Sequence, residues 1–264
     1  MEQQQAQERI KELSEKINYY NQKYYQEHIS EISDYEFDML LSELISLENL
    51  YPQFKAPDSP SQRVGGSITK EFASIKHQYP MLSLGNTYSE QGVRDFDERV
   101  KKFLNTSQDI EYVCELKFDG VSMSIIYENG LFKQAITRGD GVQGDDVSNN
   151  VKTIRTIPLR IQAENLPARF EVRGEVFMSK ETFEKLNKER EDIGETLYAN
   201  PRNTASGTIK LQDSAEVARR GLDCYLYFLL GENLPFQTHS ESLEVLSKWG
   251  FQVSSTYRVC KNIE

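Results

Sequence analysis

The sequence predicts an α+β protein in which a small N-terminal helical domain precedes a domain of antiparallel sheets flanked by helices. Apolar residues recur at helical spacing in the first 50 residues, a proline-rich connection follows, and alternating apolar patterns then dominate. The chain has 264 residues, enough for about two domains. We place these domains at residues 1–69 and 70–264.

The N-terminal domain is expected to contain two helices. Across residues 7–28, apolar side chains three and four positions apart share one face. Ser33 and Glu36 have the spacing of a capping box, so a second helix is expected to begin there. Three prolines within residues 52–60 then end this helix. The expected inner face of the second helix comprises Phe37, Leu40, Leu44 and Leu47.

The second domain is expected to mix helices with strands. A helix is expected at residues 89–104, and the apolar residues on its inner face would be Val93, Phe96, Val100 and Phe103. Apolar residues alternate in two runs around Asn129-Gly130, which predicts a β-hairpin. The remaining expected elements are strands at 168–178 and 222–230 and helices at 179–192 and 240–249.

Charge and composition exclude several classes of protein. Acidic residues outnumber basic ones, 41 to 31, and the excess is concentrated in the first 50 residues. This charge disfavours tight nucleic-acid binding by the chain alone. The longest apolar run, residues 224–230, is far short of the ~20 residues that span a bilayer, and the N-terminus has no apolar leader. Three widely spaced cysteines favour a reducing compartment. We therefore expect a cytoplasmic protein without a membrane partner.

The first candidate for chemistry is the run Glu-Leu-Lys-Phe-Asp-Gly at residues 115–120. In an extended segment, Glu115, Lys117 and Asp119 share one side. A lysine nucleophile must lose its proton, whereas neighbouring carboxylates favour the charged form, so a further cation is expected nearby. The alternative is a surface lysine with two ion-pair partners.

Two further segments combine arginine with glycine. In Thr-Arg-Gly-Asp-Gly at 137–141, the glycines let the backbone approach a ligand and Arg138 can clamp a phosphate or carboxylate. An ordinary Gly-Asp turn is the alternative. In Glu-Val-Arg-Gly-Glu at 171–175, alternate charged residues share one face, and Glu175 could accept a hydrogen bond from a ribose hydroxyl. A solvated strand face is the alternative there.

Two later features suit a nucleotide. Residues 198–203, Tyr-Ala-Asn-Pro-Arg-Asn, read as a polar loop, and its Arg202 together with Lys210 suits phosphate. The ring of Tyr227 could stack on a base, although a core position is the alternative.

Aromatic and acidic residues crowd the junction of the first two helices. Such a group can hold a flat cationic ring through cation–π and charge contacts, and an amphipathic helix with an acidic outer face is the alternative. The group comprises Tyr24, Tyr25, Asp34, Tyr35, Phe37 and Asp38.

The order and spacing of these motifs closely resemble those of the NAD-dependent DNA ligases of bacteria. The Lys-x-Asp-Gly motif at 117–120 is followed by the three motifs above that contain Arg138, Glu175 and Arg202. Three earlier segments are also similar to this family: ISDYEFD at 32–38, PDSPSQRVGG at 57–66 and MLSLGN at 81–86.

The resemblance implies a reaction and a set of roles. Lys117 would attack the α-phosphorus of NAD, release nicotinamide mononucleotide and carry AMP, with Mg²⁺ as a cofactor and no metal-ligating residue assigned. A helical cap would hold the nicotinamide mononucleotide half, and a nucleotidyltransferase core would hold the adenylate. The implied cofactor-binding residues are Tyr24, Tyr25, Asp34, Tyr35, Glu36, Phe37, Asp38, Ser83, Leu84, Glu115, Leu116, Asp119, Arg138, Glu175, Arg202 and Tyr227.

The same resemblance implies that the chain is an N-terminal fragment, because the family's later motifs would follow Glu264. Nicked duplex DNA is then the partner of the full-length protein and binds this chain weakly or not at all. We expect a monomer that seals no nicks and adenylates itself weakly or not at all.

Three other functions stay open at this point. An ATP-using ligase or RNA-capping enzyme also carries the Lys-x-Asp-Gly motif. In a non-catalytic NAD-binding module, Lys117 would only pair with Asp119. In an interaction domain, the acidic helical face would recruit a basic partner.

Overall fold

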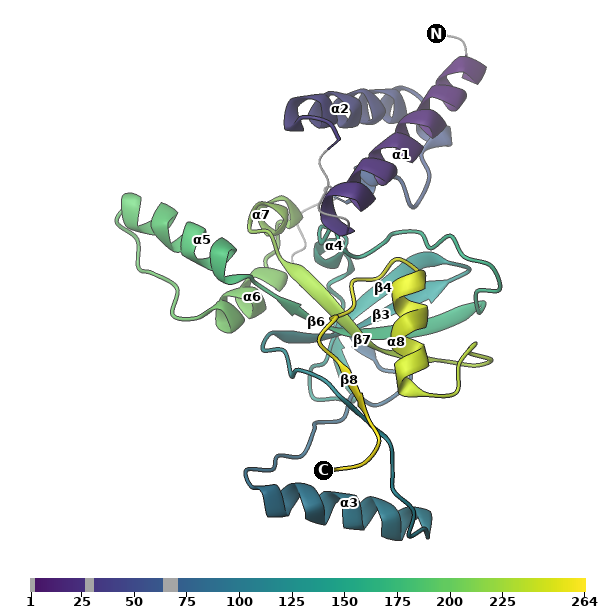
Figure 1. The fold of residues 1–264 in the computed structure, drawn as a ribbon. Helices are drawn as coiled ribbons and strands as arrows, with labels where there is room; N and C mark the ends of the chain where they lie inside the picture. The colour runs from purple at the N-terminus through teal and green to yellow at the C-terminus, as the bar shows by residue number, and fades with distance from the viewer. Residues whose placement is uncertain (1–2, 27–30, 64–70) are drawn as a thin grey trace.

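The computed structural model describes residues 3–26, 31–63 and 71–264, and its α+β architecture confirms the expected fold class (Figure 1). The helices are α1 (Gln3–Gln26), α2 (Asp34–Leu50), α3 (Glu90–Leu104), α4 (Ser148–Val151), α5 (Lys180–Asp192), α6 (Pro201–Ile209), α7 (Ser214–Arg219) and α8 (His239–Lys248), with short 3₁₀ turns at Pro52–Phe54 and Pro60–Gln62. The strands are β1 (Ser74–Lys76), β2 (Tyr112–Cys114), β3 (Val121–Glu128), β4 (Leu131–Thr137), β5 (Gln143–Asp145), β6 (Arg169–Phe177), β7 (Asp223–Gly231) and β8 (Arg258–Cys260).

A four-stranded antiparallel sheet in the order β4-β3-β6-β7 forms the centre of the second domain. The expected hairpin is confirmed: β3 and β4 are joined by Asn129 and Gly130, both at positive φ, as a two-residue hairpin turn requires. Buried side chains of this sheet, among them Ile125, Tyr127 and Val172, share one core with Trp249 of the segment after α8. Two-stranded sheets, β1-β5 and β2-β8, lie beside it.

The N-terminal helices pack through the apolar face that the sequence pattern predicts. Leu13 and Ile17 of α1 are fully buried, as is Leu44 of α2. The capping box is confirmed as well, because Ser33 and Glu36 exchange their side-chain and backbone hydrogen bonds at the start of α2.

Helix α3 departs from its expected packing. Its range and its Ser89 cap agree with the sequence pattern, yet the Phe103 side chain is 89% exposed and Phe96 is 46% exposed. In Figure 1 this helix lies at the end of the molecule opposite α1 and α2. The helical spacing of the apolar residues therefore identified an apolar face of α3 but not whether another element packs against that face.

Polar groups connect the helical domain to the sheet domain. The Arg63 guanidinium donates to the carbonyl oxygens of Lys152, Ile154 and Ile157, at 3.1 to 3.3 Å. The Arg155 guanidinium lies 5.6 Å from the ring centre of Phe37 on α2. The contact is thus made mainly by arginine side chains. None of the helices in the described part of the chain combines the length and apolar character needed to cross a membrane.

Candidate active site

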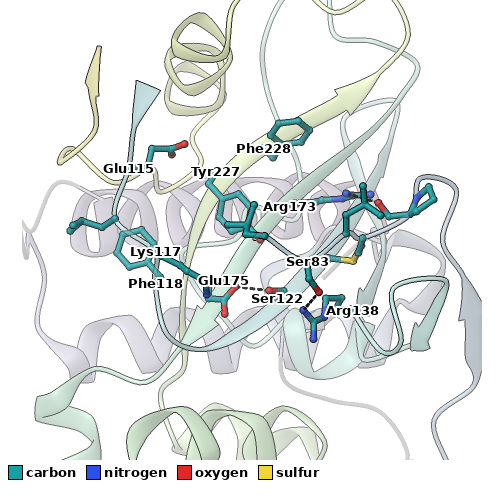
Figure 2. Close-up of a pocket in the computed structure, with 15 residues that line it drawn as sticks. Ser83, Glu115, Lys117, Phe118, Ser122, Arg138, Arg173, Glu175, Tyr227 and Phe228 are labelled. Atoms are coloured by element: carbon teal, nitrogen blue, oxygen red, sulfur yellow. Dashed lines mark hydrogen bonds between the residues drawn. The ribbon is translucent and has the colours of Figure 1, made fainter. Parts of the chain in front are cut away.

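A cavity of about 510 Å³ opens beside the central sheet (Figure 2). Its walls come from the segment before α3, the segment between β2 and β3, and strands β6 and β7. The lining residues are Pro80, Met81, Leu82, Ser83, Leu84, Glu115, Leu116, Lys117, Phe118, Ser122, Arg138, Arg173, Glu175, Tyr227 and Phe228.

Lys117 reaches this cavity from an irregular segment. Strand β2 ends at Cys114 and β3 begins at Val121, so residues 115–119 do not form the expected strand. Glu115 through Phe118 all line the cavity. In a regular strand, successive side chains point to opposite faces, so four consecutive residues could not all do so. Asp119, the other flanking acid, is not among the lining residues.

Both acids that flank Lys117 have other side-chain partners. Arg202 Nη1 donates to Asp119 Oδ1 at 2.9 Å, and His239 Nε2 lies 2.6 Å from Glu115 Oε2. No described residue forms a hydrogen bond or ion pair with the Lys117 ammonium group. The arrangement therefore differs from the alternative in which Lys117 is a surface lysine paired with its neighbours.

Glu175 supports the turn that follows Lys117. Its two carboxylate oxygens accept from the Gly120 backbone N–H at 3.1 Å and from the Ser122 hydroxyl at 2.7 Å. A side chain at position 120 would place its Cβ 2.2 Å from the Val176 carbonyl oxygen, so only glycine fits there. Buried Glu175 thus fixes the loop that carries the lysine, and it remains a candidate ribose contact.

Arg173 holds the opposite wall of the cavity. Its guanidinium donates to Glu171 Oε1 at 2.7 Å and to the carbonyl oxygens of Tyr79 and Pro80 at 2.6 and 3.1 Å. The Glu171 side chain is only 5% exposed, which excludes the solvated strand face considered above. Glu171 and Glu175 of β6 are instead buried and hydrogen-bonded, as burial of charge requires. Arg173 thereby fixes the segment that leads to Ser83.

A β-bulge aims two aromatic rings at the cavity. Arg173 pairs with Phe228, and the next residue on β6, Gly174, pairs with Leu226, so the register skips Tyr227. As a result Tyr227 and Phe228, although adjacent in sequence, both line the cavity (Figure 2). Burial raises the pKa of the Tyr227 phenol, and the Glu175 charge adds to the effect.

The Thr-Arg-Gly-Asp-Gly motif combines a turn with a cavity residue. The Asp140 carboxylate accepts from the backbone N–H groups of Val142 and Gln143, both at 2.8 Å, and these bonds lower its pKa. The turn proposed as an alternative is therefore present. Arg138 precedes it and lines the cavity, where its guanidinium donates to the Ser83 hydroxyl at 3.4 Å (Figure 2).

Arg202 lies on a helix rather than in the expected polar loop. The Asn200 side chain caps α6 by accepting from the Asn203 N–H, and Pro201 occupies the first helical position. These residues are a start signal that the sequence interpretation did not use. The helix N-terminus thereby places Arg202 beside Asp119.

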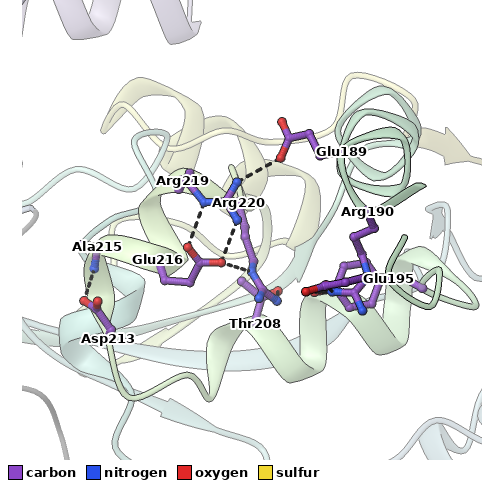
Figure 3. Close-up of polar contacts among 10 residues, drawn as sticks. Glu189, Arg190, Glu195, Thr208, Asp213, Ala215, Glu216, Arg219 and Arg220 are labelled. Atoms are coloured by element: carbon purple, nitrogen blue, oxygen red, sulfur yellow. Dashed lines mark hydrogen bonds and ion pairs between the residues drawn. The ribbon is translucent and has the colours of Figure 1, made fainter. Parts of the chain in front are cut away.

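A network of ion pairs on α7 contacts α6 (Figure 3). The Glu216 carboxylate of α7 accepts from both Arg219 and Arg220, and Arg220 also donates to the Thr208 hydroxyl of α6 at 3.3 Å. These arginines, with the Arg219 hydrogen bond as the largest cause, hold the pKa of Glu216 at about 2. The network connects α7 to the helix that carries Arg202.

None of the expected nicotinamide contacts whose side chains the structure describes lines this cavity. Tyr35 is 74% exposed, Asp38 is also exposed, and Glu36 is engaged in the α2 cap. Phe37 is half-buried beside Arg155. The side chains of the other three expected contacts lie outside the described residues: Tyr24, Tyr25 and Asp34.

The structure thus brings only part of the predicted set together. The residues that line the cavity are Lys117, Ser83, Leu84, Glu115, Leu116, Arg138, Glu175 and Tyr227, whereas Asp119 and Arg202 form a pair outside this set. The sequence interpretation missed Ser122, Phe228 and His239. His239 is 124 residues from Glu115, so no local pattern would have revealed their contact.

Comparison with protein families gives two matches that divide the chain. Residues 69–264 match the NAD-dependent DNA ligase adenylation domain, and residues 3–65 match the DNA ligase-like, N-terminal NAD⁺-binding domain. The chain belongs to the NAD-dependent DNA ligase adenylation domain family. The N-terminal match favours NAD over the ATP of other enzymes with the Lys-x-Asp-Gly motif.

Individual relatives agree with the family. A DNA ligase of Cytophaga hutchinsonii is 59% identical over 260 residues, which are 98% of this chain and 38% of the relative. DNA ligases of Phocaeicola vulgatus and Thermoanaerobacter are 54% and 52% identical, each over 97% of this chain and 38% of the relative. The chain therefore spans about 38% of the length of these ligases.

Proposed function

We propose that the chain carries out the first step of an NAD-dependent DNA ligase, transfer of an adenylyl group from NAD to Lys117. The Lys117 amine, after losing a proton, attacks the α-phosphorus of the adenylyl half. A P–N bond forms, the bond from this phosphorus to the bridging oxygen breaks, and nicotinamide mononucleotide leaves with the electron pair. The product is a lysyl-AMP on the protein.

One observation supports this proposal above the others. Lys117 lines a cavity large enough for a nucleoside, and both neighbouring carboxylates are paired with Arg202 and His239. Neither carboxylate is therefore an ion-pair partner of the amine. A lysine without a partner at the wall of such a cavity is typical of a covalent nucleophile rather than a structural ion pair.

The remaining cavity residues supply recognition of the adenosine half. We assign the base to the space between the 82–84 segment and the Tyr227 ring, which can stack on it. Glu115 is assigned to the edge of the base, Glu175 to the ribose, and Arg138 to the phosphate, where its planar guanidinium suits two oxygens.

The nicotinamide mononucleotide half is assigned to the helical domain. The pyridinium of NAD is a flat cation, and the exposed Tyr35 ring and Asp38 carboxylate offer the matching cation–π and charge contacts. This assignment also includes the residues whose side chains the structure does not describe, Tyr24, Tyr25 and Asp34.

Mg²⁺ is proposed as a companion of the NAD phosphates. Among residues 3–26, 31–63 and 71–264, no three His, Cys, Asp or Glu side chains form a group of the kind that cages a metal. Mg²⁺ keeps several waters and needs only one or two carboxylates beside phosphate oxygens, so exposed Asp119 is sufficient on the protein side. The ion would offset phosphate charge, as it does in other phosphoryl transfers.

The complete ligase reaction extends this proposal. We infer that the full-length protein seals nicked duplex DNA in replication and repair, as a monomer in the cytoplasm. The described cysteines are all unpaired, which is typical of a reducing compartment. With its acidic charge, this chain alone is expected to bind DNA weakly or not at all and to leave nicks open.

Intact-mass analysis after exposure to NAD and Mg²⁺ tests the proposal. We expect an increment of about 330 Da, the mass of AMP less water, confined to position 117 and present on a minor fraction of this chain. Lys117→Ala should abolish the increment and leave binding of AMP within about twofold. ATP in place of NAD should give no label.

A chain extended past Glu264 serves as the positive control for adenylation. Label on another residue, label from ATP, or no label on either chain would contradict the proposal. A non-catalytic NAD-binding module would raise the melting temperature with NAD but give no label on either chain.

A further inference from the structure

We propose that His239 is a positioning residue that aims Glu115 at the amino group of the purine and so sets a preference for adenine over hypoxanthine. This inference rests on the proposed function, because it assumes that the cavity takes the adenosine half of NAD. It assigns the role to a residue that does not itself line the cavity.

The contact between the two side chains is short and half-buried. His239 Nε2 lies 2.6 Å from Glu115 Oε2, and the exposed fractions of the two side chains are 29% and 31%. Glu115 lines the cavity, whereas His239, the first residue of α8, is not among the lining residues. The histidine therefore contacts the carboxylate without being part of the cavity wall.

Several neighbours hold the histidine ring. Thr238 caps α8 in a full capping box with Glu241, which fixes the backbone at position 239. Ser242 Oγ lies 3.4 Å from His239 Nδ1, and the ring centres of His239 and Phe228 are 5.7 Å apart with a 36° tilt. Phe228 is itself a cavity residue, so the imidazole is fixed relative to the proposed base site.

This geometry leaves one carboxylate oxygen for the ligand. Glu115 Oε2 accepts from His239 Nε2, and no described residue donates to Oε1. An ionised carboxylate only accepts hydrogen bonds, so Oε1 can accept from the exocyclic amine of adenine. Hypoxanthine carries a carbonyl oxygen at that position, which would face the carboxylate without a proton between them.

Removing the His239 side chain should therefore reduce the preference for adenine over hypoxanthine more than it reduces the stability of the fold. Without the Nε2–H donor, the Glu115 side chain can rotate among several rotamers. Adenine must then order this side chain when it binds, which weakens its binding. A merely structural role, in which the contact attaches α8 to the segment after β2, would lower affinity for both purines equally.

Calorimetric titration with AMP and with IMP, the hypoxanthine analogue, separates these roles. We expect the wild-type chain to bind AMP at least about tenfold more tightly than IMP, and His239→Ala to reduce this ratio by about fivefold or more. His239→Gln should restore most of the ratio, because its amide can donate to the same oxygen. Glu244→Ala, an exposed residue farther along α8, is the matched control and should change nothing.

Each other outcome has a definite meaning. An unchanged AMP-to-IMP ratio in a folded His239→Ala protein overturns this inference and leaves the proposed function intact. Tighter AMP binding by that variant also overturns it, since His239 would then compete with the base for Glu115. A wild-type chain that binds neither nucleotide overturns the proposed function together with this inference.

Discussion

The cavity and the junction between the two domains are built in different ways. The cavity is supported by buried acids of the central strand β6, where Glu171 and Glu175 are 4% and 8% exposed and have hydrogen-bond partners. At the junction, Arg63 of the helical domain donates to carbonyl oxygens of the sheet domain. From the sheet domain, Arg155 donates to Asn21 and Arg160 to Asp58. The proposed adenosine site is thus fixed by buried groups of the central sheet, whereas the helical domain is held to the sheet domain by arginine side chains that lie outside that sheet.

This difference predicts that cavity substitutions will affect stability and nucleotide binding together. Junction substitutions should affect neither strongly. Four changes test it, from the largest expected effect to the smallest.

Replacing Arg173 with Met should produce the largest loss. The change leaves the buried Glu171 carboxylate without its cation and frees two backbone carbonyls, so we expect a destabilisation of about 3 kcal/mol. AMP affinity should fall as well, because the segment that leads to Ser83 is released. Urea unfolding and calorimetry measure the two effects. The double variant Glu171→Leu/Arg173→Met should regain part of the stability without the binding, and equal recovery of both would argue against a positioning role.

Gly120→Ala should come next, at about 2 kcal/mol, because its Cβ would lie 2.2 Å from the Val176 carbonyl oxygen. Gly207→Ala is the matched control: no heavy atom lies within 4 Å of its Cβ, and alanine at this exposed position of helix α6 should add about 0.5 kcal/mol of stability. Thermal unfolding followed by circular dichroism compares them. Equal melting temperatures for the two variants would show that the lysine loop is not fixed as described.

The Glu216 network predicts an acid-side loss of stability. Its pKa is lowered from 4.5 to about 2, so its contribution is complete above pH 4.5 and is lost as the pH falls toward 2. Because the carboxylate is 31% exposed, solvent screening reduces this contribution to about 1 kcal/mol. Glu216→Gln should therefore lower stability at pH 7 and flatten its decline over that window, as followed by urea midpoints. A decline as steep as that of the wild-type chain would assign the acid sensitivity to other carboxylates.

Arg155→Ala should have the smallest effect. It removes a contact with the Phe37 ring and a 3.4 Å bond to Asn21, together about 0.5 kcal/mol or less. AMP binding should stay within about twofold of the wild-type value by calorimetry. A larger loss of AMP affinity would mean that the junction and the cavity are coupled, contrary to the comparison above.

The sequence alone predicts those elements whose signal lies in neighbouring residues. The hairpin at Asn129-Gly130 and the capping box at Ser33 follow from residues within one turn of each other, and both are confirmed. The polar residues 198–203 predict a loop, yet an Asn followed by Pro is also a helix start, and helix α6 begins there.

Features that depend on distant partners could not be predicted. The covering of an apolar face depends on tertiary packing, so the exposure of Phe103 on α3 was not foreseen. The burial and pairing of Glu171 depend on β6 becoming a central strand, which alternation alone does not specify. Recognition of the family identified Lys117 and its motifs, but the partners of Glu115 and Asp119 required the fold.

The register shift at Tyr227 makes β7 unusually sensitive to chain length. Every residue of this strand after the shift faces the side that it does because one extra residue is accommodated there. Deleting a single residue at this point would remove one ring from the cavity wall and would force either the strand end or the loop before α8 to move. The position of both rings in the cavity wall therefore depends on the number of residues in β7, and homologous chains should tolerate exchange of either aromatic residue better than loss of one position.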